Sequence, residues 1–116
     1  KITNKKIKHM QIVIKKQIGR TVYSFMVDGK NLHELIMQSQ KLSFSDVYKC
    51  GKCGKDNLRL AARKAQGFEY TEIRCNDCKA SLTFGSKKED KDISYLRKND
   101  DGSFDWKSVD EQSISE

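Results

Sequence analysis

The segments CGKC (Cys50–Cys53) and CNDC (Cys75–Cys78) contain all four cysteines of the chain, and 21 residues separate them. Two CxxC pairs at this spacing are typical of one tetrahedral zinc site built from two short turns, or knuckles. The stretch between the pairs is long enough for a hairpin that returns the second pair to the first. We therefore predict one structural Zn²⁺ ion with four ligands: Cys50, Cys53, Cys75 and Cys78.

Zinc bound by four thiolates has no open coordination position, so such a site stabilises a fold and does not activate water. Two disulfides and a redox-active dithiol are the alternatives for the same cysteines. Zinc is favoured because nothing in the chain resembles a secretory signal, whose apolar region is longer than the run Met10–Ile14. Zinc ligation would also leave no thiolate free for redox chemistry.

The composition of the 116-residue chain supports one small domain, because only 36% of its residues are hydrophobic and 34% are charged. A chain with such a modest core benefits from a structural metal ion. No stretch approaches the roughly 20 apolar residues that a membrane-spanning helix requires. We therefore expect a cytoplasmic protein that does not act at a membrane.

The formal net charge of +7 is unevenly distributed. Residues 87–116 carry six Lys/Arg and nine Asp/Glu, a net charge of −3, so residues 1–86 carry +10. A zinc ion with four thiolates would add about −2 to this body. A basic body with an acidic tail is suited to binding a polyanion, and the tail could compete for the same surface. The alternative is a solvated, lysine-rich surface with a disordered end.

The overall pattern predicts a small α+β fold that is mostly β, in which an N-terminal hairpin and a short helix precede the zinc ribbon. The hairpin is expected over residues 9–27. Its strands, His9–Lys16 and Thr21–Val27, are rich in β-branched residues, and the turn between them contains Gly19.

A short helix is expected over residues 31–40. Asn31 followed by Glu34 resembles a capping box, with Asn in place of the usual Ser or Thr. Three apolar residues follow at helical spacing and should form one apolar face: Leu32, Leu35 and Ile36.

The zinc ribbon is expected over residues 47–85, and together with the hairpin and helix it forms a basic body over residues 1–86. Leu58–Lys64 and Phe68–Arg74 should form a hairpin, and Ala80–Phe84 should add a third strand. Gly54 follows the first cysteine pair, where a glycine can adopt the left-handed conformation that turns backbone N–H groups toward the sulfurs.

Residues 87–116 are expected to form an acidic, partly disordered tail. Within it, the segment 93–106 could fold back onto the body, with a short strand around Tyr95 that pairs with the ribbon. Phe104 and Trp106 would then serve as anchors. Beyond Val109 the chain is polar, which favours disorder.

Cations and aromatic rings occur together in two hairpins, which is the combination that binds phosphates and unpaired bases. Rings interleaved with cations suit single strands better than duplexes, whose stacking faces are hidden. Each ring could instead belong to the core of a small ribbon. The candidate residues are Lys15, Lys16, Arg20, Tyr23 and Phe25 in the first hairpin, and Arg59, Arg63, Lys64, Phe68, Tyr70 and Arg74 in the second.

A further set of residues surrounds the second cysteine pair: Tyr70, Glu72, Arg74, Cys75, Cys78, Ala80, Leu82, Phe84 and Gly85, with Asp105-Trp106 downstream. Over residues 48–106, this segment resembles small phage-encoded zinc-ribbon proteins that are grouped with single-stranded DNA-binding proteins of replication and recombination. The resemblance implies a non-enzymatic protein that coats single-stranded DNA in the host-cell cytoplasm, with the four cysteines as zinc ligands. It also implies that the acidic tail recruits a protein partner.

We expect no enzymatic activity, because the sequence contains neither a Gly-rich phosphate loop nor a nucleophile–base constellation. Glu69 and Glu72 are interpreted as strand-surface charges. Two other interpretations stay open: a zinc-ribbon transcription factor, and a docking adaptor or inhibitor that binds a host protein through the acidic tail. The hairpin edges could pair between chains, but nothing in the sequence indicates a dimer.

Overall fold

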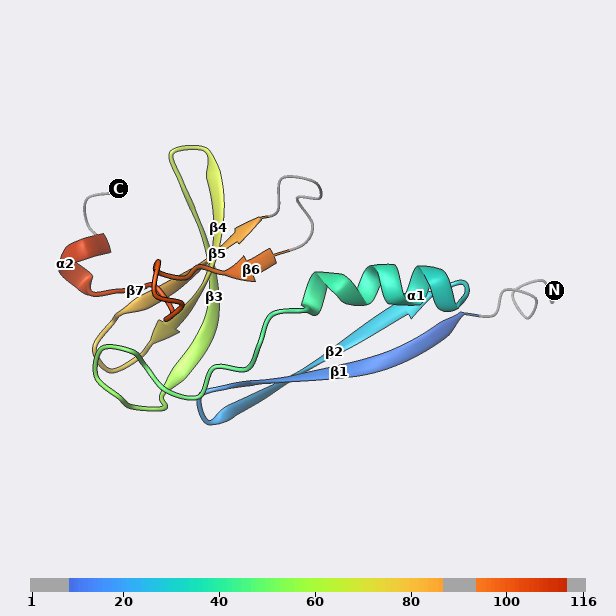
Figure 1. The fold of residues 1–116 in the computed structure, drawn as a ribbon, viewed down its shortest axis with the longest axis horizontal. Coiled ribbons are helices and arrows are strands. Elements are labelled where there is room, and N and C mark those ends of the chain that lie inside the picture. Colours follow the sequence, from blue (N-terminus) through green and yellow to red (C-terminus); the bar gives the residue numbers. More distant parts are fainter. Residues whose placement is uncertain (1–8, 87–93, 113–116) are drawn as a thin grey trace.

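The computed structural model describes residues 9–86 and 94–112, which form a small, mostly β fold (Figure 1). Within these residues, β1 and β2 make a two-stranded sheet, and a second sheet has the order β3-β4-β5-β6, with β7 also pairing with β5. The elements are β1 (Met10–Ile18), β2 (Thr21–Gly29), α1 (Leu32–Ser39), the 3-10 helix η2 (Gln40–Leu42), β3 (Leu58–Ala65), β4 (Phe68–Cys75), β5 (Ser81–Ser86), β6 (Ser94–Leu96), β7 (Trp106–Lys107) and α2 (Val109–Gln112).

Strands β1 and β2 form the expected hairpin, which projects from the second sheet as an arm together with α1 (Figure 1). β1 continues past its predicted end to Ile18, because this side chain is fully buried in the core. The turn at Gly19 is fixed by the loop before β3. The N–H of Gly19 donates to the Val47 carbonyl (2.7 Å), and the N–H of Arg20 donates to the Asp56 carbonyl (2.9 Å).

Helix α1 begins as predicted, with Asn31 Oδ1 accepting the N–H of Glu34 at 2.9 Å. The Glu34 carboxylate reaches back to the N–H of Lys30 (2.6 Å), one residue before the cap. The expected apolar face, however, is not buried as a unit. Leu35 is only 3% exposed, whereas Leu32 and Ile36 are 62% and 48% exposed. The reason is that α1 packs on a sheet of only two strands, which is too narrow to cover more than one row of its side chains.

The core lies on one face of the second sheet. In β3 and β4, the pairs Leu58↔Cys75 and Leu60↔Ile73 share this face, and Leu82 of β5 pairs with Ile73. The core includes the end of the arm, and its buried members are Ile18, Val47, Cys50, Leu58, Ile73, Cys75, Ala80, Leu82, Phe84, Leu96 and Trp106.

The C-terminal segment folds back onto this sheet. β6 pairs with β5 through Phe84↔Leu96, and β7 pairs through Leu82↔Trp106, so Trp106 is an anchor as expected. The prediction of disorder beyond Val109 is wrong for residues 110–112, which form α2 (Val109–Gln112) together with Val109. This turn is held by a hydrogen bond from the N–H of Ser108 to the Glu111 carboxylate (2.6 Å). Residues 87–93 and 113–116 of the expected tail lie outside the described residues.

Candidate metal centre and the opposite sheet face

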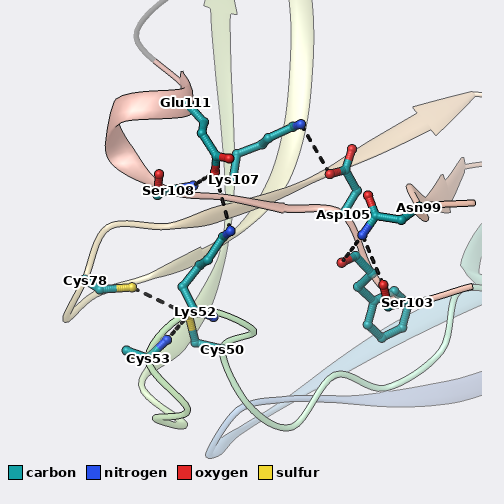
Figure 2. A network of polar contacts seen from close by, with 11 residues as sticks. Cys50, Lys52, Cys53, Cys78, Asn99, Ser103, Asp105, Lys107, Ser108 and Glu111 are labelled. Carbon is teal, nitrogen blue, oxygen red and sulfur yellow. Dashed lines mark hydrogen bonds and ion pairs between the residues drawn. The ribbon is translucent and has the colours of Figure 1, made fainter. Parts of the chain in front are cut away.

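The four cysteine sulfur atoms converge where β3 begins and β4 ends. Cys50 Sγ lies 3.5 Å from Cys78 Sγ, and Cys53 Sγ lies 3.6 Å from Cys75 Sγ. All four sulfur atoms lie within 4.8 Å of one another. Figure 2 shows Cys50, Cys53 and Cys78 side by side, with the contact between Cys50 and Cys78 drawn. This cluster of thiols is close enough to hold a metal ion.

The two turns that carry the cysteines share one backbone hydrogen-bond pattern. The N–H of Cys50 donates to the Lys55 carbonyl (2.8 Å), and the N–H of Cys75 donates to the Ala80 carbonyl (2.9 Å). The N–H of each second cysteine points at the Sγ of the first at 3.5 Å. These N–H groups direct positive dipole ends at sulfur, which favours the thiolate form that binds metals.

Both turns also require a left-handed residue at the same position. Gly54 has φ +78°, and its N–H donates to the Cys50 carbonyl at 2.9 Å, so the expected left-handed glycine is confirmed. Lys79 occupies the matching position in the second turn, with φ +68° and a 3.0 Å bond to the Cys75 carbonyl. A side chain with a Cβ is strained in this conformation, whereas glycine is not.

Contacts outside the two turns hold them in place. Gly51 lies against the Trp106 ring so closely that a Cβ at position 51 would be 2.3 Å from the ring carbon Cδ1. The second turn is tied to the start of β3, because Asn76 donates its backbone N–H to the Asn57 carbonyl (2.8 Å) and its side-chain amide to Asn57 Oδ1 (3.1 Å). A salt bridge from Lys52 to Glu111 (3.6 Å) links the first turn to α2 (Figure 2).

The proximity of the sulfurs separates the pKa values of the thiols. Burial would raise the pKa of Cys75, but the N–H groups of Cys78 and Asp77, together with the thiols of Cys53 and Cys78, lower the pKa to about 7. The N–H of Ala80 lowers the pKa of Cys78, whereas burial and contact with the other thiols raise it to about 12. Four thiolates at this distance repel one another, and a divalent cation among them would hold all four deprotonated.

The opposite face of the same sheet gathers most of the predicted nucleic-acid residues of the second hairpin. In the register of β3 and β4, the pairs Arg59↔Arg74, Arg63↔Tyr70 and Ala65↔Phe68 alternate with the core pairs, so their side chains lie on the face away from the core. We call this surface the arginine face. It consists of Arg59, Arg63, Phe68, Tyr70, Glu72 and Arg74.

Glu72 lies at the centre of the arginine face and is 1% exposed, so its interpretation as a strand-surface charge is wrong. Its neighbours across the strands, Ala61 and Thr83, are small, and two guanidinium groups cover the carboxylate. Arg63 Nε lies 3.4 Å from Glu72 Oε1, and Arg74 Nε lies 3.1 Å from Oε2. Arg74 lies two residues from Glu72 on the same strand, but Arg63 comes from the neighbouring strand β3, so alternation within β4 alone does not identify the cluster.

The rings of the arginine face differ in exposure. Arg63 lies over the half-buried Tyr70 ring at 4.6 Å from the ring centroid. Phe68, next to the turn between β3 and β4, is 65% exposed. Arg59 is exposed and donates to Asn76 Oδ1 at 2.9 Å, which connects the arginine face to the second cysteine turn. Phe68 is therefore the ring of this face with the largest free surface.

The predicted residues of the first hairpin are not brought to the arginine face. Tyr23 and Phe25 stack on each other on the inner face of the arm, which is the face on which α1 packs. Their ring centroids are 6.4 Å apart. The Tyr23 hydroxyl accepts the N–H of Leu60, and Lys16 donates to the Phe44 carbonyl. These contacts join the arm to the body.

Three other predicted cations also lie apart from the arginine face. Arg20 forms a salt bridge with Asp56 (2.9 Å), and Lys15 lies on the outer face of the arm. Lys64 alternates with Arg63 and therefore projects from the opposite face of the β3–β4 hairpin, where it pairs with the exposed Glu69 at 3.9 Å. Exposed pairs of this kind contribute little to stability.

Sequence reasoning missed two residues on the side of the arginine face. The Tyr95 ring lies over Gly85, where a Cβ would be 2.7 Å from the ring, and Tyr95 is 45% exposed. Lys107 pairs with Ser81, which pairs with Arg74. Gly85, directly after the predicted strand Ala80–Phe84 and inside the observed β5, was the available signal, because a glycine in a strand often accommodates a ring from the neighbouring strand.

Comparison with protein-family models, curated proteins and solved structures finds no match to this chain. Among residues 9–86 and 94–112, no helix has the length and apolar character needed to cross a membrane.

Metal removal tests the role of the cysteine cluster. We expect one metal ion per chain by elemental analysis under reducing conditions, and we expect a chelator to abolish cooperative unfolding, because metal binding contributes directly to folding in such small domains. Cys75→Ser should reduce the bound metal. A chain that keeps its circular dichroism spectrum and its urea transition without metal would contradict a structural role, and two disulfides per chain would support the alternative.

Lys79→Gly tests the backbone of the second turn. Relief of the left-handed strain, about 1–2 kcal/mol, should outweigh the greater freedom of glycine in the unfolded chain, for a net stabilisation of about 0.5–1 kcal/mol. As a matched control, Lys64→Gly in β3 should destabilise by about 0.5–1 kcal/mol. Urea denaturation of the metal-loaded protein measures both. Equal losses of stability in the two variants would refute the left-handed assignment.

Proposed function

We propose that this protein binds single-stranded nucleic acid without sequence specificity, has no enzymatic activity, and is stabilised by one Zn²⁺ ion in the cysteine cluster. The observation that carries the proposal is the arginine face, where three guanidinium groups and two rings share one side of a sheet.

The chemistry of the cluster favours zinc. Four thiolates without a carboxylate or imidazole are typical of structural zinc sites, and Zn–S bonds of about 2.3 Å in a tetrahedron require sulfur–sulfur separations of about 3.8 Å. The separations of 3.5 and 3.6 Å across the two turns are close to this value. A zinc ion with four protein ligands would supply rigidity and no catalytic water.

The arginine face suits an extended strand better than a duplex. Guanidinium groups bind phosphates, and an exposed ring offers a stacking surface that every base can use. Arg59, Arg63 and Arg74 carry three positive charges, and the only carboxylate of the face, Glu72, is buried beneath two of them. Phosphates approaching this face would therefore meet cations first.

The resemblance to phage-encoded zinc-ribbon proteins suggests the biological setting. We propose DNA as the nucleic acid, and coating of single strands during phage-type replication or recombination as the process. Recruitment of a protein partner by the acidic tail is a separate proposal within the same setting.

A salt-resolved comparison of oligo-dT with a duplex of equal length tests the proposed function. We expect tighter binding to the single strand, and a linear fall of log affinity with log salt, because bound phosphates release counterions. The competing docking function predicts instead a defined protein partner that is retained after nuclease treatment. Binding that is indifferent to salt, or stronger on the duplex, would refute single-strand binding through the arginine face.

Phe68→Ala tests the exposed ring of the arginine face. Because Phe68 is 65% exposed, we expect the folded protein to be retained, while the affinity for oligo-dT falls by about 1–3 kcal/mol through loss of stacking. Tyr48→Ala is a matched control, since Tyr48 is 58% exposed but lies outside the arginine face. Fluorescence anisotropy at fixed salt measures both affinities. Equal effects of the two variants would argue against a specific stacking role for Phe68.

A further inference from the structure

The arm has an outer face that α1 does not cover. α1 packs on the inner face, where Leu35 is buried. On the outer face, Val13, Val22 and Met26 are 52%, 53% and 63% exposed. An isolated two-stranded hairpin is marginally stable, and packing of its apolar side chains against another element stabilises it. An apolar outer face on such an arm is therefore a candidate interaction surface.

The charges on this outer face are arranged around its apolar centre. Val13 of β1 pairs with Met26 of β2. On the same face, the next residue pair toward the turn at Gly19 contains Lys15, and the next pair away from that turn contains Asp28. All four side chains share the outer face, because they alternate with the inner residues of β1 and β2. No ion pair involving Lys15 or Asp28 is found within the part of the chain that the structure describes.

This arrangement is complementary to itself. The dimer would have a twofold axis that lies in the contact plane between the two copies. This axis runs nearly perpendicular to the strands and passes close to the Val13–Met26 pair. Rotation about it packs the Val13–Met26 pair of one copy against the same pair of the other. The same rotation brings Lys15 of one copy toward Asp28 of the other. Sheets that pack face to face cross at about 30°, so residues at diagonally opposite positions of the two outer faces come together. The same axis reverses the strand direction, so the two zinc-bearing bodies lie at opposite ends of the dimer.

We propose that the outer face of the arm binds a second copy of this chain, forming a twofold dimer with its hairpins packed face to face. The proposal is independent of nucleic-acid binding, because the arginine face lies on the other sheet. It also assigns Lys15 to a protein interface. The dimer would present two arginine faces on one elongated particle.

The size of the contact sets the expected affinity. One hairpin face is at the small end of specific interfaces, so we expect a dissociation constant on the order of 10–100 µM. Sedimentation equilibrium of the metal-loaded chain, without nucleic acid, over a concentration range that brackets these values measures the self-association. A chain that stays monomeric at concentrations roughly tenfold above this range would overturn the proposal.

Met26→Lys tests the apolar centre, and Ile36→Lys is its matched control. Ile36 is 48% exposed on α1, outside the outer face of the arm. We expect Met26→Lys to weaken self-association at least about tenfold, because it desolvates a charge at the centre of the contact. Ile36→Lys should leave the dissociation constant within about twofold of the unmodified chain. Circular dichroism and metal content verify that both variants fold. If Ile36→Lys dissociates the dimer and Met26→Lys does not, the contact lies elsewhere.

A charge-reversal cycle tests the twofold geometry itself. Lys15→Asp or Asp28→Lys alone should weaken the dimer roughly tenfold, because each places like charges opposite one another. The double variant restores opposite charges in the reversed sense and should recover the unmodified affinity to within about threefold. Losses that simply accumulate in the double variant would contradict the proposed pairing of Lys15 with Asp28.

Discussion

The convergence of the four cysteine sulfurs is the constraint on which the rest of this structure depends. β3 begins and β4 ends at this point, since Leu58 pairs with Cys75. The loop between the first turn and β3 contains Asp56, whose carbonyl receives the N–H of Arg20 and so holds the turn of the arm. Trp106 of the C-terminal segment closes the same region by packing on Gly51. One small cluster therefore connects the arm, the sheet and the C-terminal segment.

The two-residue alternation of β3 and β4 places the core on one face of the sheet and the arginine face on the other. The residues that alternate with the core pairs form the arginine face, so the sulfur cluster that fixes the strands also fixes the spacing of the arginines. Glu72 contributes to that spacing, because it holds the guanidinium groups of Arg63 and Arg74 across the strands. A charge-assisted pair of this kind orders long side chains that would otherwise be mobile. The guanidinium groups of Arg63 and Arg74 are thus held in place by contacts within the folded protein.

Local patterns in the sequence predicted the strands, the cap of α1 and the proximity of the cysteines, because each depends on residues close in sequence or on ligand spacing. The burial of Glu72 could not be predicted this way, since it requires Arg63 from a neighbouring strand. Exposure of Leu32 and Ile36 also escaped prediction, because helical periodicity indicates an apolar face but not the width of the sheet beneath it. The order of residues 109–112 depends on contacts with the first cysteine turn, which the composition of that segment does not reveal.

An NMR titration of the zinc-loaded, ¹⁵N-labelled protein with oligo-dT tests most directly whether the arginine face binds single-stranded nucleic acid. In this titration, amide shift changes are mapped residue by residue. Binding through the arginine face predicts that the largest changes fall on this face, at Arg59, Arg63, Phe68 and Arg74, and that the amides of the four cysteines change little. Changes concentrated on the arm, or spread evenly over the basic residues, would contradict it.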